Sequence, residues 1–174
     1  MENTLRNCNF PDWAIAVSTT FLFGCASLSS PKIEPGDFQI LTGKKWTGTL
    51  TYLEYSKHKK VSIPSDLIVS QSTDNKLKWN FNFQYPEEPK ANQTNAISMN
   101  ADGRMIDDEK VLQKSYLADG MLKIVTEKNG RDNNKPALLR YTYLVGSRTF
   151  SIKKEVQIEG DKEFFERNEY RWER

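Results

Sequence analysis

Histidine and cysteine are scarce in this sequence, which has a single histidine, His58, and two cysteines, Cys8 and Cys25, among its 174 residues. It also lacks a G-x-S-x-G motif, a glycine-rich phosphate-binding loop and a cluster of Cys and His with the spacing of zinc ligands. Ser-His-Asp and Cys-His catalysis need a well-positioned histidine, whereas His58 lies in a lysine-rich turn. We therefore expect neither an enzyme nor a bound metal or other cofactor.

Neither sign of charge dominates, because 25 Lys and Arg residues face 23 Asp and Glu residues, for a net charge of +2. This balance gives no indication of a nucleic-acid partner. We interpret the short basic run at 57–60 as the solvated end of a hairpin. The acidic run at 107–109 is interpreted as an exposed bend, with Ca²⁺ binding through its carboxylates as the alternative.

Long hydrophobic runs are absent as well. The longest uncharged apolar stretch near the N-terminus runs from Trp13 to Phe23, eleven residues. It is too short for a permanent membrane-spanning helix, which takes about 20 residues, but it is typical of the apolar core of a signal peptide. We predict that residues 1–24 are removed, which leaves Cys25 as the only thiol and excludes an intramolecular disulfide. The alternative is a buried apolar segment with an incidental cysteine.

The tetrapeptide that follows this stretch, Leu22-Phe23-Gly24-Cys25, resembles a bacterial lipobox. This resemblance implies that a peptidase cuts before Cys25, that Cys25 carries lipid, and that the protein is a periplasm-facing membrane lipoprotein of the bacterial cell envelope. Residues 25–36 are then a tether that holds the domain off the membrane. The folded domain is expected over 37–174, and one domain suffices for this length.

The rest of the sequence predicts an all-β fold. Residue pairs able to adopt positive φ recur at short intervals, as hairpin turns require: Asp74-Asn75, Asp102-Gly103, Asp119-Gly120, Asn129-Gly130, Gly146-Ser147 and Gly160-Asp161. The segments between them have the length and composition of strands and show no helical period. About nine strands are expected, near 45–56, 61–72, 76–85, 96–101, 104–117, 121–128, 136–145, 148–159 and 163–173.

These strands need a second surface on which to bury their apolar face, and no helix is expected to supply it. Closing the sheet into an antiparallel up-and-down barrel solves this problem and removes the exposed edges. A two-sheet β-sandwich is the alternative. Sequential short turns favour the meander barrel.

The hairpin loops near the C-terminus predict a register, because loop length fixes which residues meet. A two-residue loop at Gly146-Ser147 sets Tyr143 opposite Phe150 and Tyr141 opposite Ile152. A three-residue loop at 160–162 sets apolar residues together and opposite charges together: Ile158 with Phe164, Ile152 with Tyr170, Phe150 with Trp172, Lys153 with Glu169 and Glu155 with Arg167.

The segment Gly43-Lys44-Lys45-Trp46-Thr47-Gly48 heads the first strand, and Arg171 and Arg174 flank Trp172 at the end of the last. This arrangement resembles the lipocalins and related calycins, in which an early Trp packs at the closed end of the barrel under an Arg from the final strand. The resemblance implies structural roles for Trp46 and Arg171 in barrel closure.

Alternation through the final hairpin places three polar side chains, Lys154, Glu166 and Asn168, inside the barrel. Charged groups there are costly unless they are paired or wet. We expect them to fix the polar head of a small apolar or lipid-like ligand. The expected lining of its body is Trp79, Phe81, Phe83, Tyr141 and Tyr143.

Two other interpretations of these polar groups stay open: a water-filled mouth, or Lys154 and Glu166 satisfying each other. The sequence therefore favours an exported, lipid-anchored binding protein. The alternative is a structural or interaction lipoprotein whose barrel is filled by its own aromatic residues and whose outer face contacts a partner protein.

Overall fold

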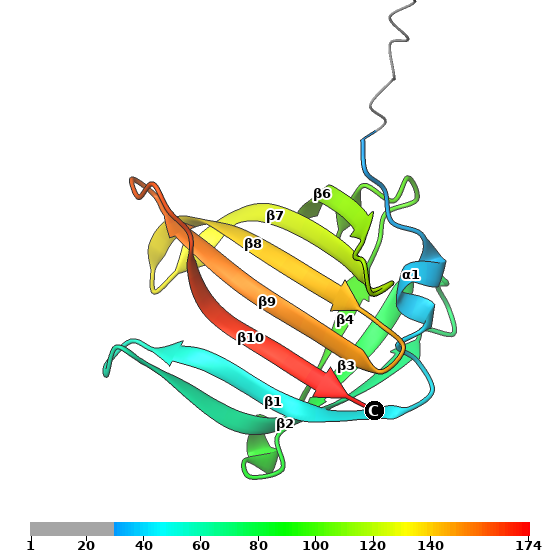
Figure 1. Ribbon diagram of the computed structural model, residues 1–174, viewed down its shortest axis with the longest axis horizontal. Coiled ribbons are helices and arrows are strands. Elements are labelled where there is room, and N and C mark those ends of the chain that lie inside the picture. Colours follow the sequence, from blue (N-terminus) through cyan, green and yellow to red (C-terminus); the bar gives the residue numbers. More distant parts are fainter. Residues whose placement is uncertain (1–29) are drawn as a thin grey trace, which may run out of the picture.

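The computed structural model describes residues 30–174 as one antiparallel sheet of ten strands, nearly closed into a barrel (Figure 1). The predicted signal peptide and Cys25 lie outside the described residues. The prediction of an all-β meander is confirmed, because strands that follow one another in the chain pair with each other, except for β4 and β5, which are the two edges of the sheet. The first and last strands, β1 and β10, also pair with each other. No helix formed by residues 30–174 is long and apolar enough to cross a membrane.

A short helix precedes the strands, and a single 3₁₀ turn interrupts them. The elements are α1 (Pro35–Gln39), β1 (Lys45–Glu54), β2 (Lys59–Gln71), β3 (Lys78–Gln84), η1 (Pro89–Ala91), β4 (Gln93–Ser98), β5 (Met105–Ile106), β6 (Glu109–Tyr116), β7 (Leu122–Asp132), β8 (Lys135–Val145), β9 (Thr149–Ile158) and β10 (Phe165–Glu173). The strand predicted at 104–117 is divided into β5 and β6, which raises the count to ten.

The two edge strands of the sheet, β4 and β5, meet where the sheet closes. Met99, just after β4, forms a bridge with Ile106 of β5, and the Asp107 N–H donates to the Ser98 carbonyl over 2.6 Å. Asp107 has a φ of 51° and forms a two-residue turn with Asp108 between β5 and β6. The acidic run at 107–109 is therefore the corner at which the barrel closes.

The three carboxylates of that corner have different nearest partners. Asp107 accepts from the Ser98 N–H at 2.8 Å, Asp108 contacts the Lys128 ammonium at 2.8 Å, and Glu109 is buried inside the barrel. They do not converge on one point as the ligands of a Ca²⁺ ion would.

Helix α1 fills one end of the barrel, where no helix is expected from the sequence. Pro35 occupies its first turn, and the Glu34 N–H donates to the Asp37 carboxylate, which caps its start. Phe38 is buried against the rings of Trp79 and Phe81. The chain already packs on the barrel at Ile33, which is buried and donates its N–H to the Gly103 carbonyl at 2.8 Å. Ile33 and α1 thus both pack on the barrel.

Two of the predicted turns are displaced. The hairpin between β7 and β8 turns at Asn133 and Asn134, both with positive φ, whereas Asn129-Gly130 lies within β7. The β8–β9 loop turns at Ser147-Arg148, since Val145 pairs with Phe150 and Tyr143 with Ile152. The predicted pairs of Tyr143 with Phe150 and Tyr141 with Ile152 are wrong by two residues, a shift that leaves every side chain on its expected face.

The predicted register of β9 and β10 holds over most of the hairpin. Ile152 pairs with Tyr170, Phe150 with Trp172 and Lys153 with Glu169. A β-bulge between Glu166 and Asn168 then shifts the pairing, so that Glu155 faces Glu166 and Val156 faces Phe165. The predicted pairs of Glu155 with Arg167 and Ile158 with Phe164 are wrong for this reason.

The closed end of the barrel is sealed by Trp46 and an arginine from the end of the chain, but the arginine is Arg174. Its guanidinium lies 4.1 Å from the Trp46 ring centre and donates to the Ile40 carbonyl at 2.7 Å. Arg171, predicted for this role, has a side chain that is 73% exposed and pairs with Glu169 on the outer face. The one-residue alternation of β10 explains the difference, since Arg171 follows Tyr170 and precedes Trp172, which both face inwards.

Gly48 allows β1 and β10 to approach each other closely, which gives a first prediction. A Cβ atom at this position would lie 1.9 Å from the Arg171 carbonyl oxygen. Gly48→Ala should therefore lower the free energy of unfolding by roughly 2–3 kcal/mol, as overpacking against rigid backbone does. Urea denaturation measures the change. Gly36→Ala is the matched control, because a Cβ there meets nothing within 4 Å; equal stabilities of the two variants would contradict the close approach.

Candidate functional site

The interior of the barrel has two unlike halves. In the half next to α1, the aromatic residues Trp46, Trp79, Phe81, Phe150 and Trp172 are fully buried, and their rings contact one another or that of Phe38. The other half lies toward the tips of the β1–β2, β7–β8 and β9–β10 hairpins (Figure 1). There Ala137, Leu139 and Val156 form a small buried cluster, and eight other inward-facing side chains are only half-buried. These are Leu50, Tyr52, Ile63, Tyr141, Ile152, Lys154, Asn168 and Tyr170. Water therefore reaches this second half, which we call the open half.

Three of the predicted ligand-lining residues belong to the packed half. Trp79 and Phe81 are 0% exposed and Phe83 is 6% exposed. The Trp79 ring contacts that of Phe38, and the rings of Phe81 and Phe83 contact each other and those of Phe150 and Trp172. They form the floor below the open half and do not surround a ligand along its length.

The open half contains a cluster of four side chains, Tyr55, Asp132, Lys154 and Arg167, which we call the mouth cluster. Asp132 is buried and lies at its centre, with its Oδ1 3.7 Å from Lys154 Nζ and 3.5 Å from Arg167 Nε. The Tyr55 hydroxyl donates to Asp132 Oδ2. Two cations thus share a single carboxylate.

The mouth cluster is held from several strands. The Arg167 guanidinium lies 4.6 Å from the Tyr55 ring centre and donates to the Leu53 carbonyl at 2.7 Å. Burial, followed by the hydrogen bond to Asp132, raises the pKa of Tyr55 to about 12, so its hydroxyl stays a neutral donor at physiological pH. Lys154 keeps 21% of its side chain exposed and pairs across the strands with Asn168, as predicted.

Glu166 is absent from this cluster because of the β-bulge in β10. It pairs with Glu155, and its carboxylate contacts Lys60 Nζ at 2.6 Å. Together with Glu169 and Arg171 it lines a pocket of about 360 Å³ on the outer face of the sheet. The prediction that Glu166 lies inside, diagonal to Lys154, is wrong, and Arg167 takes the inward place.

A second polar group, Glu109, lies between the two halves. Its carboxylate accepts from the Thr126 hydroxyl at 2.6 Å and from the Tyr143 hydroxyl at 3.0 Å, and it lies 3.9 Å from Lys128 Nζ. Burial raises the pKa of Glu109. Tyr143, predicted to line a ligand, is buried and donates a hydrogen bond to this carboxylate. Tyr141 is half-buried, and its ring centre lies 5.7 Å from Lys128 Nζ.

Sequence reasoning missed Asp132, Arg167 and Glu109. Asp132 would have been found if the turn had been placed at Asn133-Asn134, because alternation from the apolar Leu122 and Ile124 leads to Asp132 on the inner face. No sequence signal marks the bulge that brings Arg167 inwards. Glu109 was assigned to an exposed bend because two acidic residues precede it.

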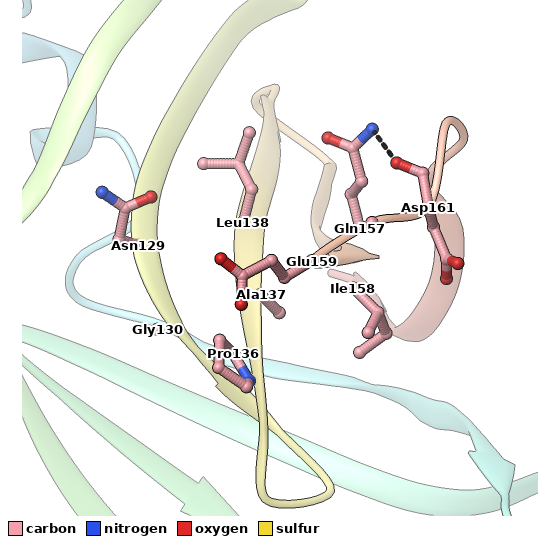
Figure 2. A pocket seen from close by; sticks show the side chains of 10 residues that line it. Asn129, Gly130, Pro136, Ala137, Leu138, Gln157, Ile158, Glu159 and Asp161 are labelled. Carbon is pink, nitrogen blue, oxygen red and sulfur yellow. Dashed lines mark hydrogen bonds between the residues drawn. The ribbon is translucent and has the colours of Figure 1, made fainter.

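The clearest surface pockets lie outside the barrel. One of about 460 Å³ is formed where β7, β8 and β9 approach their ends (Figure 2). Asn129, Leu138 and Gln157 line it from paired positions on the outer face, and Gln157 Nε2 donates to the Asp161 carbonyl at 3.0 Å. None of the predicted ligand residues contributes to it. Among residues 30–174, no three His, Cys, Asp or Glu side chains gather as metal ligands.

A comparison with protein-family models finds no match for this chain, and neither does a comparison with curated proteins.

Burial of Glu109 predicts a pH dependence of stability. A carboxyl whose pKa is raised by folding stabilises the fold at acid pH, and this contribution is lost as the pH rises through the folded-state pKa. Glu109→Gln keeps acceptors for Thr126 and Tyr143 but cannot ionise. Its free energy of unfolding relative to wild type should therefore increase between pH 4 and pH 7, as measured by urea denaturation at each pH. Glu173→Gln, at an exposed position, is the control; a difference between Glu109→Gln and wild type that does not change with pH would contradict the assignment.

Proposed function

We propose that this chain is a binding protein that holds an amphipathic ligand with an anionic head in the open half of the barrel. The observation that carries the proposal is the charge of the mouth cluster, in which Lys154 and Arg167 share one carboxylate, Asp132. An excess cation in a half-buried site is costly unless an anion joins it. The head of the ligand would supply that anion.

The two cations suit this task in different ways. A guanidinium offers several N–H donors in a fixed plane, which match a carboxylate or phosphate, and a lysine ammonium adds a mobile point charge. Asn168, across from Lys154, adds a neutral amide that can hydrogen-bond to the same head. The half-buried Leu50, Ile63, Ile152 and Tyr170 would contact the apolar body of the ligand above Phe83 of the floor, whose ring centre lies 5.2 Å from that of Tyr170.

We further propose that the protein is an exported lipoprotein of a bacterial envelope with a lipocalin-like barrel. Support for export and anchoring comes from the uncharged stretch before Cys25 and the lipobox-like Leu22-Phe23-Gly24-Cys25. Support for the lipocalin-like assignment comes from the ten-stranded, nearly closed meander and from Arg174 over Trp46 at its closed end.

A second candidate function is favoured by the packed half of the barrel. Trp79, Phe81 and Phe150 fill the space that a deep ligand would need. A barrel filled by its own aromatic residues suits an interaction lipoprotein that contacts a partner through its outer face. The two functions differ in one respect that is measurable, which is whether the purified protein binds a small amphiphile.

The binding proposal predicts a preference for an anionic head. Laurate and 1-dodecanol share the same chain length and differ in charge, so their affinities can be compared by isothermal titration calorimetry. Lys154→Ala should weaken laurate binding about tenfold, because a charge-assisted hydrogen bond is lost, and should leave dodecanol binding within about twofold.

Lys153→Ala is the matched control, since Lys153 directly precedes Lys154 in β9 and forms an ion pair with Glu155 on the outer face. Equal weakening of both probes by Lys154→Ala would reject the head-group role of Lys154. Failure of the wild-type protein to bind either probe would reject the binding function and favour the interaction protein.

Anchoring is tested separately. Cys25→Ser removes the thiol that lipidation requires, so the protein should move from the membrane fraction to the soluble fraction when cells are fractionated. A Cys25→Ser protein that stays in the membrane fraction to the same extent as wild type would contradict anchoring through Cys25.

A further inference from the structure

One edge of the sheet is bare. Strand β4 pairs with β3 from Gln93 to Ser98, but its other edge is tied only at the end, by Met99 to Ile106 and by the Asp107 N–H to the Ser98 carbonyl. Every residue from Gln93 to Ala96 is exposed, including those on the inner face. Within the described part of the chain, the outer edge of β4 thus has no strand partner over 93–97, and solvent reaches both of its faces.

The opposite edge of the sheet is formed by the two-residue strand β5 and by the part of β6 that β5 leaves uncovered, and it carries protection that β4 lacks. Strand β6 has a β-bulge between Val111 and Gln113, carries Lys110 and Lys114, and is tied to α1 by Lys114 Nζ to Asp37 at 2.8 Å. Bulges, lysines and covering elements are the features that prevent edge-to-edge pairing. Strand β4, with the sequence QTNAIS, has no charge, no proline and no bulge in its ladder to β3.

We propose that β4 is a pairing site for a second copy of this chain, with the two β4 strands antiparallel about a two-fold axis at Asn95. In such a pair each residue lies opposite its symmetry mate: Asn95 opposite Asn95, Thr94 opposite Ala96, and Gln93 opposite Ile97. Like charges in these positions would repel each other. The uncharged sequence of β4 is compatible with self-pairing for this reason.

The pairing is self-limiting, because a two-fold contact uses the same edge of both copies and leaves no further edge for a third. The unpaired backbone N–H and C=O groups of both β4 edges gain hydrogen-bond partners when the pair forms. The contact is one strand wide, so the buried area should fall below about 1,200 Å², in the range of weak complexes. A dimer that dissociates on dilution is therefore expected, and it is independent of the ligand proposed for the open half.

Charge variants at the proposed axis test this pairing. Sedimentation velocity is measured over a range of concentrations on the full chain carrying Cys25→Ser, so that attached lipid does not contribute. Asn95→Lys and Asn95→Glu should each raise the dimer dissociation constant at least about tenfold, because identical charges then face each other. An equimolar mixture of the two variants should recover a heterodimer. Asn129→Lys, an exposed asparagine of β7, is the control and should behave as the parent does.

Amide hydrogen exchange supplies a second readout, since exchange over 93–97 should slow as the protein concentration rises. A parent protein that stays monomeric at every concentration would overturn the proposal. A dimer that Asn95→Lys leaves unchanged, or that the mixture does not restore, would place the contact on another surface and overturn it as well.

Discussion

The packing of Phe38 into one end of the barrel is the contact on which the rest of the interior depends. Its ring contacts those of Trp79, Phe81 and Tyr143. The short helix α1 that carries it lies beside β6, to which Asp37 is joined by an ion pair with Lys114. A sheet with one apolar face must bury that face against something, and here one helix residue and the facing strands form the larger core at one end, while the other end has only the small cluster of Ala137, Leu139 and Val156. The half of the barrel beyond this contact keeps inward-facing side chains that water can reach.

The polar groups of the open half follow from the geometry of β10. Without its β-bulge, alternation would place Glu166 inside, where it would neutralise Lys154. The bulge instead brings Arg167 to Asp132 and leaves Glu166 to pair with Lys60 outside. With Glu166 inside, Lys154 would face two carboxylates, Glu166 and Asp132; with Arg167 in its place, two cations face Asp132 alone. One extra residue in a strand thus changes the charge of this cluster from negative to positive, which is the basis of the proposed preference for an anionic head.

The sequence predicted the fold class and the faces of the strands well, because alternation in β3 and β9 is strong and turn residues separate the strands. It predicted local pairing less well. A loop displaced by one residue moved the β8–β9 register by two without changing any face, whereas the bulge in β10 exchanged Glu166 for Arg167. Helix α1 has only five residues, too few to show a helical repeat of apolar residues in the sequence. The sequence therefore did not predict that a helix would fill one half of the barrel and leave the other half open. The choice of Arg171 over Arg174 failed because both are near Trp172 in sequence and only the strand's alternation separates them.

The proposed function places the ligand in the open half, and not in the packed half or the outer pockets. Nuclear magnetic resonance titration of the protein with laurate distinguishes these places. Backbone amide shifts should concentrate at Ile152, Lys154, Arg167 and Asn168, while the indole N–H signals of Trp46 and Trp79 should not move. Shifts confined to the outer pocket around Leu138 and Gln157, or no shifts at all, would contradict this placement of the ligand.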